Sequence, residues 1–334
     1  MRIIIDAMSG DKAPEEIVKG AVMARRQLGV ELTLVGKKEV VESLLTKEGC
    51  ADIEVVDARD VITMDDDPST ATRRKKDASM TVALNLLKNG GGDALVSAGS
   101  TGALLTGATL IVKRINGIRR AALSPVLPNG GAGTLLIDSG ANAECTAEYL
   151  LQFAYMGSFY AKKMMGLEKP RVGLANVGTE DGKGGSLQHE AFRLLKEAGE
   201  AGRINFVGNV EGNSVFAGDV DVIVTDGFTG NLMLKTAESM IKFMMGKLKE
   251  VFYKSTKNKL AAAVIKGDLT QMKKMLDVKE VGGTVMLGIS APVIKAHGSS
   301  DARSILAAAR QAKTCVESGI IEDIKANIEY MKIG

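Results

Sequence analysis

The 334-residue chain has no tryptophan, and aromatic residues make up only 4% of it. Proteins that bind single-stranded nucleic acid stack the bases on aromatic side chains, so this composition argues against a nucleic-acid partner. The formal net charge of +3 is also too small to indicate a polyanionic partner. We therefore expect no nucleic acid among its ligands.

Cysteine and histidine are scarce as well. The three cysteines, Cys50, Cys145 and Cys315, are odd in number and widely separated, which fits a reducing compartment and neither a disulfide framework nor a zinc site. Asp65, Asp66 and Asp67 are adjacent, but neighbouring side chains of an extended chain point apart. We predict no metal and no cofactor.

Long apolar runs are missing too. None approaches the ~20 residues that span a bilayer, and the charge at Arg2 comes too early for a signal peptide. The sequence therefore predicts a cytoplasmic protein. No G-x-G-x-x-G follows a predicted strand, which weakens the case for a nicotinamide cofactor.

What the chain does have is five turns rich in Gly, Ser, Thr and Asn, each between an apolar run and a helical pattern. They are DAMSGD (6–11), SAGSTG (97–102), NVGTEDGKGGS (176–186), DGFTGN (226–231) and HGSS (297–300). Glycine lets the backbone approach a ligand, and the N-terminus of the following helix attracts an anion. Several such turns indicate a site for phosphate or another oxyanion.

The apolar runs and helical patterns alternate along the chain. Strands are predicted at Arg2–Ile5, Leu32–Val35, Ile53–Val56, Ala94–Ser97, Val172–Ala175, Ile204–Val207 and Val220–Thr225. Helices are predicted at Pro14–Leu28, Lys38–Leu45, Met80–Leu87, Gly102–Val112, Ala147–Met165, Leu187–Ala198 and Ser304–Glu317, and antiparallel strands within Ala121–Asp138. This alternation predicts an α/β fold with a mostly parallel, doubly wound sheet and helices on both faces. No linker divides the chain, so we expect residues 1–334 to form one interleaved domain.

The third turn places a lysine on a glycine-rich loop after a strand. Gly178-x-x-x-Gly182-Lys183-Gly184 differs from a nucleotide P-loop, which needs four residues between the glycines and Ser or Thr after the lysine. The alternative is that Lys183 is a solvated lysine in a connecting loop that has no binding role. We favour an oxyanion-binding role for Lys183, because so many glycines are a costly way to build a connection.

The fourth turn follows a buried run, which places Asp226 at the carboxyl end of a central strand and Asn231 in the next helix. Ligand sites of α/β proteins form at such ends. Asp226 is equally suited to a functional role and to capping the helix or closing the turn. The alternative for Asn231 is a capping amide, but Thr229 could supply that cap instead. We favour a functional role for Asn231.

The remaining turns have competing interpretations. Residues 97–102 form either a second anion site or a simple N-cap for the following helix. His297 is more readily explained as structural than as functional. The basic run 73–76 is either a solvated charge run or, after the three aspartates, a mobile lid or carrier-docking loop.

Residues 240–280 differ from the rest of the chain. Ten lysines and four acidic residues give this segment a net charge of +6, and methionine and phenylalanine are interspersed among them. The apolar stretch Leu260–Ile265 lies in the middle between lysines. The pattern predicts a helical hairpin with a small apolar tip and basic flanks.

In this order, the segments resemble the PlsX-type phosphate acyltransferase family of bacterial phospholipid synthesis over almost the whole chain. The segments that carry the resemblance are DAMSGDKAP (6–14), MDDDPSTATRRKKDASM (64–80), VSAGSTGAL (96–104), GANAEC (140–145), LLQFAYMGSFYAK (150–162), INFVGNVEG (204–212), DGFTGNLMLKT (226–236) and KAHGSS (295–300). Ser9, Lys12, Ser100 and Ser139 depart from the family pattern. The resemblance implies a fold similar to isocitrate dehydrogenases and phosphotransacetylases.

The resemblance also implies an activity and partners. The activity is transfer of a long-chain acyl group from acyl carrier protein to inorganic phosphate, which gives acyl phosphate. The partners are a second copy of the chain, the membrane surface and a membrane glycerol-3-phosphate acyltransferase that consumes acyl phosphate. The family's active-site lysine and asparagine correspond to Lys183 and Asn231.

The candidate residues follow from the turns and the resemblance. For phosphate or substrate binding they are Asp6, Gly10, Asp11, Ser97, Gly99, Ser100, Thr101, Gly102, Gly178, Gly184, Ser186, Asp226, Gly230, His297, Gly298 and Ser299. For membrane contact they are Leu260, Ala262, Val264 and Ile265. The competing functions are a nicotinamide-dependent dehydrogenase, which would lack its glycine fingerprint, and a non-catalytic membrane scaffold, which would leave the glycine turns without a role.

Overall fold

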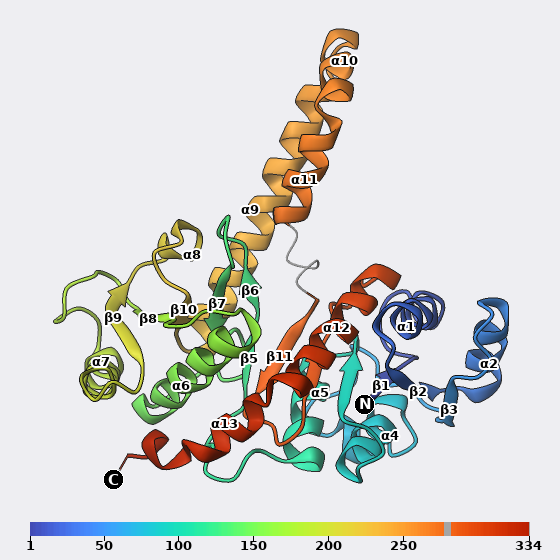
Figure 1. The fold of residues 1–334 in the computed structure, drawn as a ribbon, viewed down its shortest axis with the longest axis horizontal. Helices are drawn as coiled ribbons and strands as arrows, with labels where there is room; N and C mark the ends of the chain where they lie inside the picture. The colour runs from blue at the N-terminus through green and yellow to red at the C-terminus, as the bar shows by residue number, and fades with distance from the viewer. Residues whose placement is uncertain (277–281, 334) are drawn as a thin grey trace.

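The computed structural model describes residues 1–276 and 282–333. Within these ranges the strands form two sheets that lie side by side, with helices around them and a helical projection above (Figure 1). The larger sheet has the order β3-β2-β1-β4-β12-β11-β5, and the smaller one has the order β6-β7-β10-β8-β9.

The larger sheet is mostly parallel. Its strands are β1 (Arg2–Asp6), β2 (Glu31–Gly36), β3 (Glu54–Asp57), β4 (Ala94–Ser97), β5 (Ala122–Ser124), β11 (Thr284–Leu287) and β12 (Val293–Lys295). Only β11 pairs antiparallel, with β12 and β5. The carboxyl ends of β1, β4 and β12 therefore share one edge of the sheet.

Both faces of this sheet are covered by helices. Helices α1 (Glu15–Leu28) and α12 (Ala302–Ser318) pack on one face, and α4 (Ser79–Lys88) and α5 (Thr101–Gly107) on the other (Figure 1). Successive side chains of a strand point to opposite faces, so Ile3 and Ile5 join the first core and Ile4 joins the second. A continuous apolar run such as Ile3–Ile5 is what a strand buried on both faces requires.

The smaller sheet is parallel apart from β6. Its strands are β6 (Val126–Leu127), β7 (Thr134–Ile137), β8 (Arg171–Ala175), β9 (Asn205–Val210) and β10 (Val222–Val224). Helices α6 (Ala147–Met164) and α7 (Ser186–Glu200) cover one face, and α8 (Ser214–Ala217) and the start of α9 (Gly227–Tyr253) cover the other. One core of buried residues runs from α1 and α12 through α6 to α7, so the two sheets share it. The remaining described elements are α2 (Lys38–Lys47), α3 (Ala71–Arg74), α13 (Ile320–Ala326) and the 3₁₀ turn Ile328–Met331.

The predicted alternation of strands and helices is confirmed, with three differences. The strands divide between two sheets, since the chain leaves the larger sheet after β5 and enters the smaller one at β6. The helix predicted over Gly102–Val112 changes at Ala108 from α-helical to π-helical hydrogen bonding. The antiparallel region contains one antiparallel pair of its own, β6 with β7, whereas β5 pairs with the distant β11.

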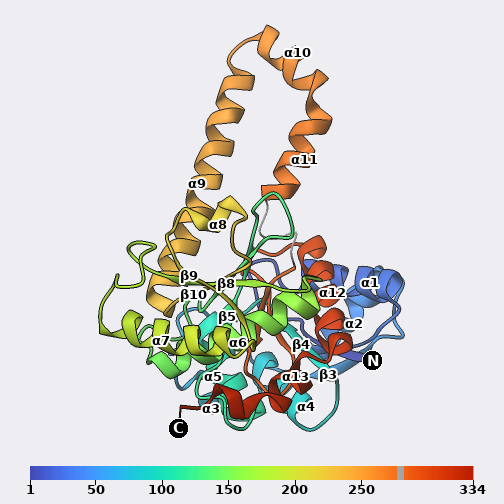
Figure 2. The same ribbon diagram turned by 60° about the vertical axis from the view of Figure 1, so that its left-hand side comes forward.

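The predicted hairpin is the projection seen in Figures 1 and 2. Helix α9 (Gly227–Tyr253) leads outward, α10 (Thr256–Val264) crosses the far end, and α11 (Lys266–Leu276) returns. The last part of the predicted segment, residues 277–280, lies outside the described residues. Among the described helices, none is long and apolar enough to cross a membrane.

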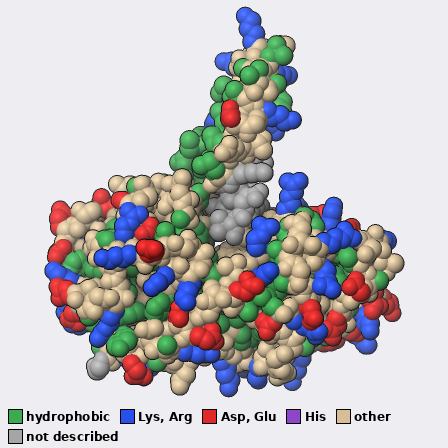
Figure 3. Space-filling view, in the orientation of Figure 1, with side chains coloured by type: hydrophobic (Ala, Val, Ile, Leu, Met, Phe, Trp, Pro, Cys, Tyr) green, Lys and Arg blue, Asp and Glu red, His purple; other side chains and the backbone are tan. Residues whose placement is uncertain are grey.

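The hairpin exposes an unusual amount of apolar surface. Val264 is 86% exposed, and α10 has no buried residue. The other exposed apolar side chains along it include Met240, Phe243, Met244, Val251, Tyr253, Leu260, Ile265 and Met275. Figure 3 shows hydrophobic side chains interspersed with basic ones along the projection. Of the four predicted tip residues, only Ala262 is partly buried.

Candidate active site

Three loops leave the same edge of the smaller sheet. Strand β10 pairs in parallel with β7 on one side and with β8 on the other. Residues 138–142 follow β7, residues 226–231 follow β10, and residues 176–186 follow β8. The loop with Lys183 and the helix with Asn231 therefore start from neighbouring strand ends, where ligand sites of α/β proteins form.

Asp226 caps helix α9. Its carboxylate accepts hydrogen bonds from the Thr229 backbone N–H at 2.8 Å and from the Thr229 hydroxyl at 2.9 Å. Asp226 is thus the N-cap, with an extended backbone where the chain enters the helix, and neither Asn231 nor Thr229 occupies that position. Asp226 thus fixes where α9 begins and which of its N–H groups face outward.

The first turn of α9 lies directly on the loop after β7. The Gly227 N–H donates a 2.7 Å hydrogen bond to the Asn142 carbonyl. A side chain at Gly227 would lie 2.6 Å from that oxygen, and one at Gly230 would overlap the Asp138 carbonyl. Both glycines are thus required for the helix to approach this loop so closely.

Asp138 is a buried carboxylate beneath this helix, and the sequence did not single it out. It accepts hydrogen bonds from the backbone N–H groups of Leu123 (2.9 Å), Ala141 (3.1 Å) and Asn142 (2.7 Å). Burial nevertheless raises the pKa of the Asp138 carboxyl above its usual value. Asp138 ties β5 of the larger sheet to the loop that supports α9.

Asn231 lies one turn further along α9 with an exposed side chain. A Cβ at Gly140 would lie 3.5 Å from the Asn231 amide oxygen, so the amide rests over that glycine. Among the described residues, the Asn231 side chain has no hydrogen-bond partner. Its two N–H donors and its oxygen are therefore open to a ligand.

Lys183 lies on an anchored loop. The Asn176 side-chain amide donates to the Lys183 carbonyl at 3.0 Å, and Gly184 has a positive φ of 92° in the turn that this bond closes. The lysine side chain packs over Gly178, where an added Cβ would lie 3.1 Å from Lys183 Cγ. It is 48% exposed and lies 3.8 Å from Glu180. Ser186 is exposed at the first position of α7.

The other turns meet at the edge of the larger sheet. The Ser97 hydroxyl donates a 2.7 Å hydrogen bond to the buried Asp6 carboxylate. The Asp11 N–H donates to the Gly298 carbonyl at 2.8 Å, and Gly10 packs against Ala98. Turns 6–11, 97–102 and 297–300 are thus brought together.

The residues of the turn 97–102 differ in their exposure and in their hydrogen bonds. Ser100 is the N-cap of α5 and accepts from the Ala103 N–H, so the capping interpretation of this turn is correct for that residue. Thr101 is exposed at the helix start, and a side chain at Gly102 would meet Pro68. The Gly99 N–H donates to the Ser97 hydroxyl at 3.2 Å.

His297 is exposed beside this edge. Its Nδ1 accepts a 3.1 Å hydrogen bond from the Ser299 N–H and lies 3.0 Å from the Ser299 hydroxyl. Nδ1 is therefore an acceptor, and in the neutral ring the proton is on Nε2. This local turn fits the structural interpretation of His297.

Lys295 is a second residue that the sequence did not single out. It ends β12, is only 8% exposed, and stands in register with Ser97 of β4. Burial lowers the pKa of its ammonium to about 8. A buried lysine at the carboxyl end of a strand had no sequence signal, because its burial depends on the packing of both sheets.

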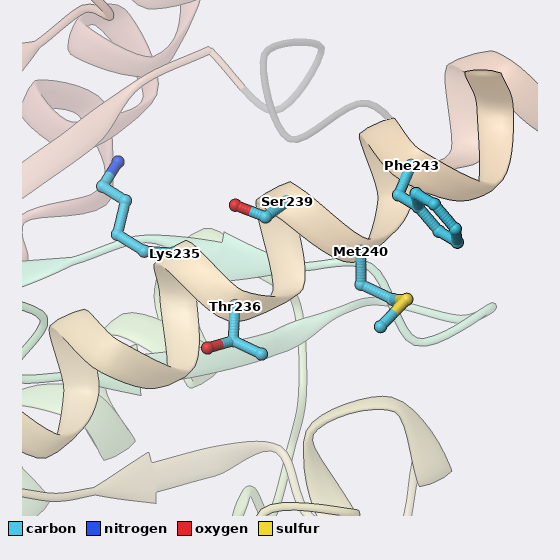
Figure 4. Close-up of a pocket in the computed structure, with 5 residues that line it drawn as sticks. All are labelled: Lys235, Thr236, Ser239, Met240 and Phe243. Atoms are coloured by element: carbon cyan, nitrogen blue, oxygen red, sulfur yellow. The ribbon is translucent and has the colours of Figure 1, made fainter.

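Helix α9 also carries a lysine, Lys235, two turns after its N-cap. Figure 4 shows Lys235 extending from α9 on the side away from Met240. The charge of Lys235 is a minor contribution to the lowered pKa of Lys295, after burial and against the opposing effects of Asp11 and Asp6. Lys235, Thr236, Ser239, Met240 and Phe243 line a groove of about 450 Å³ along the helix (Figure 4).

Cys145 lies near the loop after β7, yet its thiol is not activated. Burial raises its pKa to about 12, and the negative charge of Asp138 adds to this effect. Nucleophilic cysteines instead have lowered pKa values in electropositive surroundings.

Two of the three adjacent aspartates, Asp66 and Asp67, accept hydrogen bonds from nearby residues of the same segment. Asp66 accepts hydrogen bonds from the Thr63 N–H at 2.7 Å and from Lys75 at 2.9 Å, and Asp67 accepts from Ser69 and Thr70. In the part of the chain that the structure describes, no three His, Cys, Asp or Glu side chains are grouped as for a metal ion.

Comparison with known proteins places this arrangement in a family. Residues 1–323 match the family model described as fatty acid synthesis protein. The chain is 48% identical over 330 residues to a phosphate acyltransferase of Oceanobacillus iheyensis, covering 98% of each chain. It is 44% identical over 335 residues to a phosphate acyltransferase of Lysinibacillus sphaericus, covering all of both.

Among solved structures, a phosphotransacetylase from Streptococcus pyogenes is similar in fold. The TM-score is 0.62 at 20% sequence identity, over 96% of this chain and 94% of that one. At this identity the likeness shows the fold alone, and it confirms the predicted resemblance to phosphotransacetylase-like folds.

Proposed function

Because this chain belongs to the fatty acid synthesis protein family of phosphate acyltransferases, we propose that it transfers a long-chain acyl group from acyl carrier protein to inorganic phosphate. The product is acyl phosphate, which a membrane glycerol-3-phosphate acyltransferase consumes in phospholipid synthesis. The whole chain acts as one catalytic domain. It is cytoplasmic, forms a homodimer and associates peripherally with the membrane.

The observation that carries this proposal is the pairing of β8 with β10. It places the glycine-rich loop of Lys183 beside the first turns of α9, which carry Asn231. A lysine ammonium, an unpaired amide and the N-terminus of a long helix are all suited to negative charge. Acyl transfer to phosphate presents negative charge both on the nucleophile and on the thioester oxygen.

The reaction needs little proton chemistry. A phosphate oxygen attacks the thioester carbonyl, the C–S bond breaks, and the electron pair leaves on the carrier thiol, which takes up a proton. Phosphate is already largely dianionic near neutral pH, and a thiol of reference pKa ~8.5 is a good leaving group. Holding two anionic partners together and stabilising the oxyanion are therefore the main tasks.

Lys183 and Asn231 are assigned these tasks. Lys183 attracts and aims the phosphate, and the Asn231 amide donates to the developing oxyanion. Asp226 and Gly230 act indirectly, because they set the start of α9 and its approach to the loop after β7. The mechanism uses no metal and no acyl-enzyme intermediate.

The hairpin is assigned to dimerisation and membrane contact. Its exposed apolar side chains lack a core of their own, which favours burial against a second copy along the stem and against lipid at the tip. Each lysine near an anionic surface gains about 1 kcal/mol, whereas a small apolar tip anchors weakly. Membrane binding is therefore expected to be reversible and sensitive to salt.

The test is phosphate-dependent release of the carrier thiol from acyl carrier protein by the full-length protein. Thiol release should rise with phosphate and saturate, and sulfate at equal ionic strength should not replace phosphate. Coenzyme A thioesters in a parallel series identify the preferred donor. Release that is independent of phosphate would overturn the proposal, and no release from any donor would favour the scaffold alternative.

A further inference from the structure

The two peptide groups that flank Lys183 are both held by hydrogen bonds. The Lys183 N–H donates to the Glu180 carbonyl at 3.1 Å, and the Lys183 carbonyl accepts from the Asn176 amide at 3.0 Å. The peptide group before Lys183 also contains the Gly182 carbonyl, whose oxygen lies 3.1 Å from Nε2 of His189 on α7. Because each peptide group is planar, holding the two groups beside the Lys183 Cα fixes its φ and ψ. The direction in which the lysine side chain leaves the loop is fixed with them.

His189 is the donor in its contact with Gly182. A carbonyl oxygen can only accept, so Nε2 carries a proton and donates it. The protonated ring also has a proton on Nε2, so the hydrogen bond exists in both charge states of the ring. Among the described residues, the ring makes no second hydrogen bond or ion pair. Holding the Gly182 carbonyl is therefore the one task that the structure gives this side chain there.

Gly182 lies in open space and needs an external hold. A Cβ added there would meet nothing within 4 Å. Glycine has more backbone freedom than any other residue, so the peptide group that follows Gly182 would otherwise rotate readily. Gly184, on the other side of the lysine, is more confined, since an added Cβ would lie 2.6 Å from the Asn176 amide oxygen. The hydrogen bond from His189 thus acts on the less confined side of Lys183.

A second contact joins α7 to the same part of the loop. Lys196 lies seven residues after His189, about two turns along the helix, and its ammonium is 3.4 Å from the Asp181 carboxylate. Both side chains of this pair are more than half exposed, so the pair adds little stability of its own. It shows, however, that residues 181 and 182 lie along the side of α7 that carries His189.

We infer that His189 is a positioning residue for Lys183. Its hydrogen bond to Gly182 holds the loop so that the lysine ammonium is aimed before phosphate binds. This inference rests on the proposed function, which assigns phosphate to Lys183, and it places His189 behind the lysine and not on the substrate. Without His189, part of the loop would have to be ordered during binding, and that loss of freedom would weaken the affinity for phosphate.

The experiment compares His189→Ala and His189→Gln with the parent full-length protein. Alanine removes the donor at an exposed helical position where alanine is favourable, so the fold should persist. The side-chain amide of glutamine supplies an N–H in place of Nε2–H. The KM for phosphate should rise by roughly threefold to tenfold in His189→Ala, which corresponds to the net loss of one hydrogen bond, and should return close to the parent value in His189→Gln.

The other kinetic constants distinguish positioning from a general loss of active protein. Partial unfolding would lower kcat and leave the KM for phosphate unchanged, whereas a loosened loop raises this KM and leaves the KM for the acyl donor unchanged. The control is Glu190→Gln, which changes the next exposed side chain on α7. Glu190 pairs with Arg193 at 2.7 Å and not with the loop, so this variant should not raise the KM for phosphate.

A double-mutant cycle tests whether His189 acts through Lys183. In Lys183→Ala the ammonium is already absent, so adding His189→Ala should change the phosphate-dependent rate by no more than about twofold. The full effect of His189→Ala in both backgrounds would overturn the inference, because His189 would then act independently of the lysine. A parent-like KM for phosphate in His189→Ala would also overturn it, as would a His189→Gln variant as impaired as His189→Ala.

Phosphate binding without turnover separates this inference from the proposed function. Titration calorimetry with inorganic phosphate and no acyl donor should show parent-like affinity in His189→Gln and weaker affinity in His189→Ala, by the same factor as the rise in KM. This order of affinities in proteins that transfer no acyl group would refute the proposed function and keep the positioning role. Normal acyl transfer with equal phosphate affinity in all three proteins would keep the function and refute the positioning role.

Discussion

The side-chain amide of Asn176 donates a 3.0 Å hydrogen bond to the carbonyl oxygen of Lys183 and closes the glycine-rich loop after β8. From the adjacent strand β9, the Asn209 amide donates at 2.8 Å to the Glu180 carbonyl of the same loop. The backbone around Lys183 is thus held by two amides, while its side chain remains half exposed. A fixed backbone with an accessible ammonium is the arrangement that anion binding requires.

Gly230→Ala should destabilise the protein and impair activity. An added methyl would overlap the Asp138 carbonyl oxygen, and a backbone atom cannot give way as a flexible side chain can, so the free energy of unfolding should fall by about 1–3 kcal/mol. Denaturant unfolding measures the change. Gly246→Ala on the same helix is the matched control: its Cβ would meet nothing within 4 Å, so helix propensity should raise stability by up to about 1 kcal/mol. Equal stability of the two variants would show that α9 does not press on this loop.

Asn231→Ala should lower kcat by roughly a hundredfold without loss of stability, because an oxyanion donor is removed from an exposed helical position where alanine is favourable. Asn231→Asp should be slower still, since its carboxylate repels both phosphate and the oxyanion. Steady-state kinetics and thermal unfolding on the same samples make the comparison. If the aspartate variant were as active as the alanine variant, repulsion of phosphate and the oxyanion by a carboxylate at position 231 would not affect the rate.

Cys145→Ser should keep most of the activity. With a pKa of about 12, the thiol falls to roughly one thiolate in ten thousand molecules at pH 8, so it is a poor nucleophile. Alkylation by iodoacetamide at pH 8 should accordingly be far slower than for a free thiol, and should accelerate only as the pH approaches 12. Mass spectrometry of the enzyme during turnover provides the opposing test: an acyl group on Cys145 would establish a covalent route.

Changing Val264 and Ile265 to Asp should abolish binding to anionic vesicles and leave turnover in solution nearly unchanged. Both side chains are exposed at the tip of the hairpin, so the two charges disturb little of the fold. Vesicle flotation at low and high salt measures the effect. The control is Val40→Asp with Ile333→Asp, which introduces the same charges at sites 42% and 43% exposed away from the hairpin. Equal flotation of the tip variant and the parent would place the tip against protein and not against lipid.

Much of the fold follows from the sequence, because local patterns determine it. The run Ile3–Ile5 is apolar on both faces, and the turns after β1, β4, β8, β10 and β12 contain the glycines that their close approaches require. Asp226 satisfied two interpretations equally in the sequence. Only the backbone geometry and the hydrogen bond from the Thr229 N–H show that it caps α9.

The parts of the site that escaped the sequence depend on packing between distant segments. Asp138 is informative because the backbone N–H groups of Leu123 and Asn142 donate to it, and Lys295 because it is buried at the end of β12. Neither residue has a distinctive spacing. Their significance arises from burial, which the chain acquires only when both sheets are assembled.

The most direct test of the account is the formation of acyl phosphate by the parent protein and by Lys183→Ala. Phosphorus NMR of the reaction with acyl carrier protein and phosphate should show the acyl phosphate resonance appearing as the carrier thiol is released. Lys183→Ala should fold normally and form acyl phosphate roughly a hundredfold more slowly than the parent. The control is Lys162→Ala, which replaces an exposed lysine on α6 and should form acyl phosphate at the rate of the parent. Thiol release by the parent without acyl phosphate, or an unimpaired Lys183→Ala, would contradict the account.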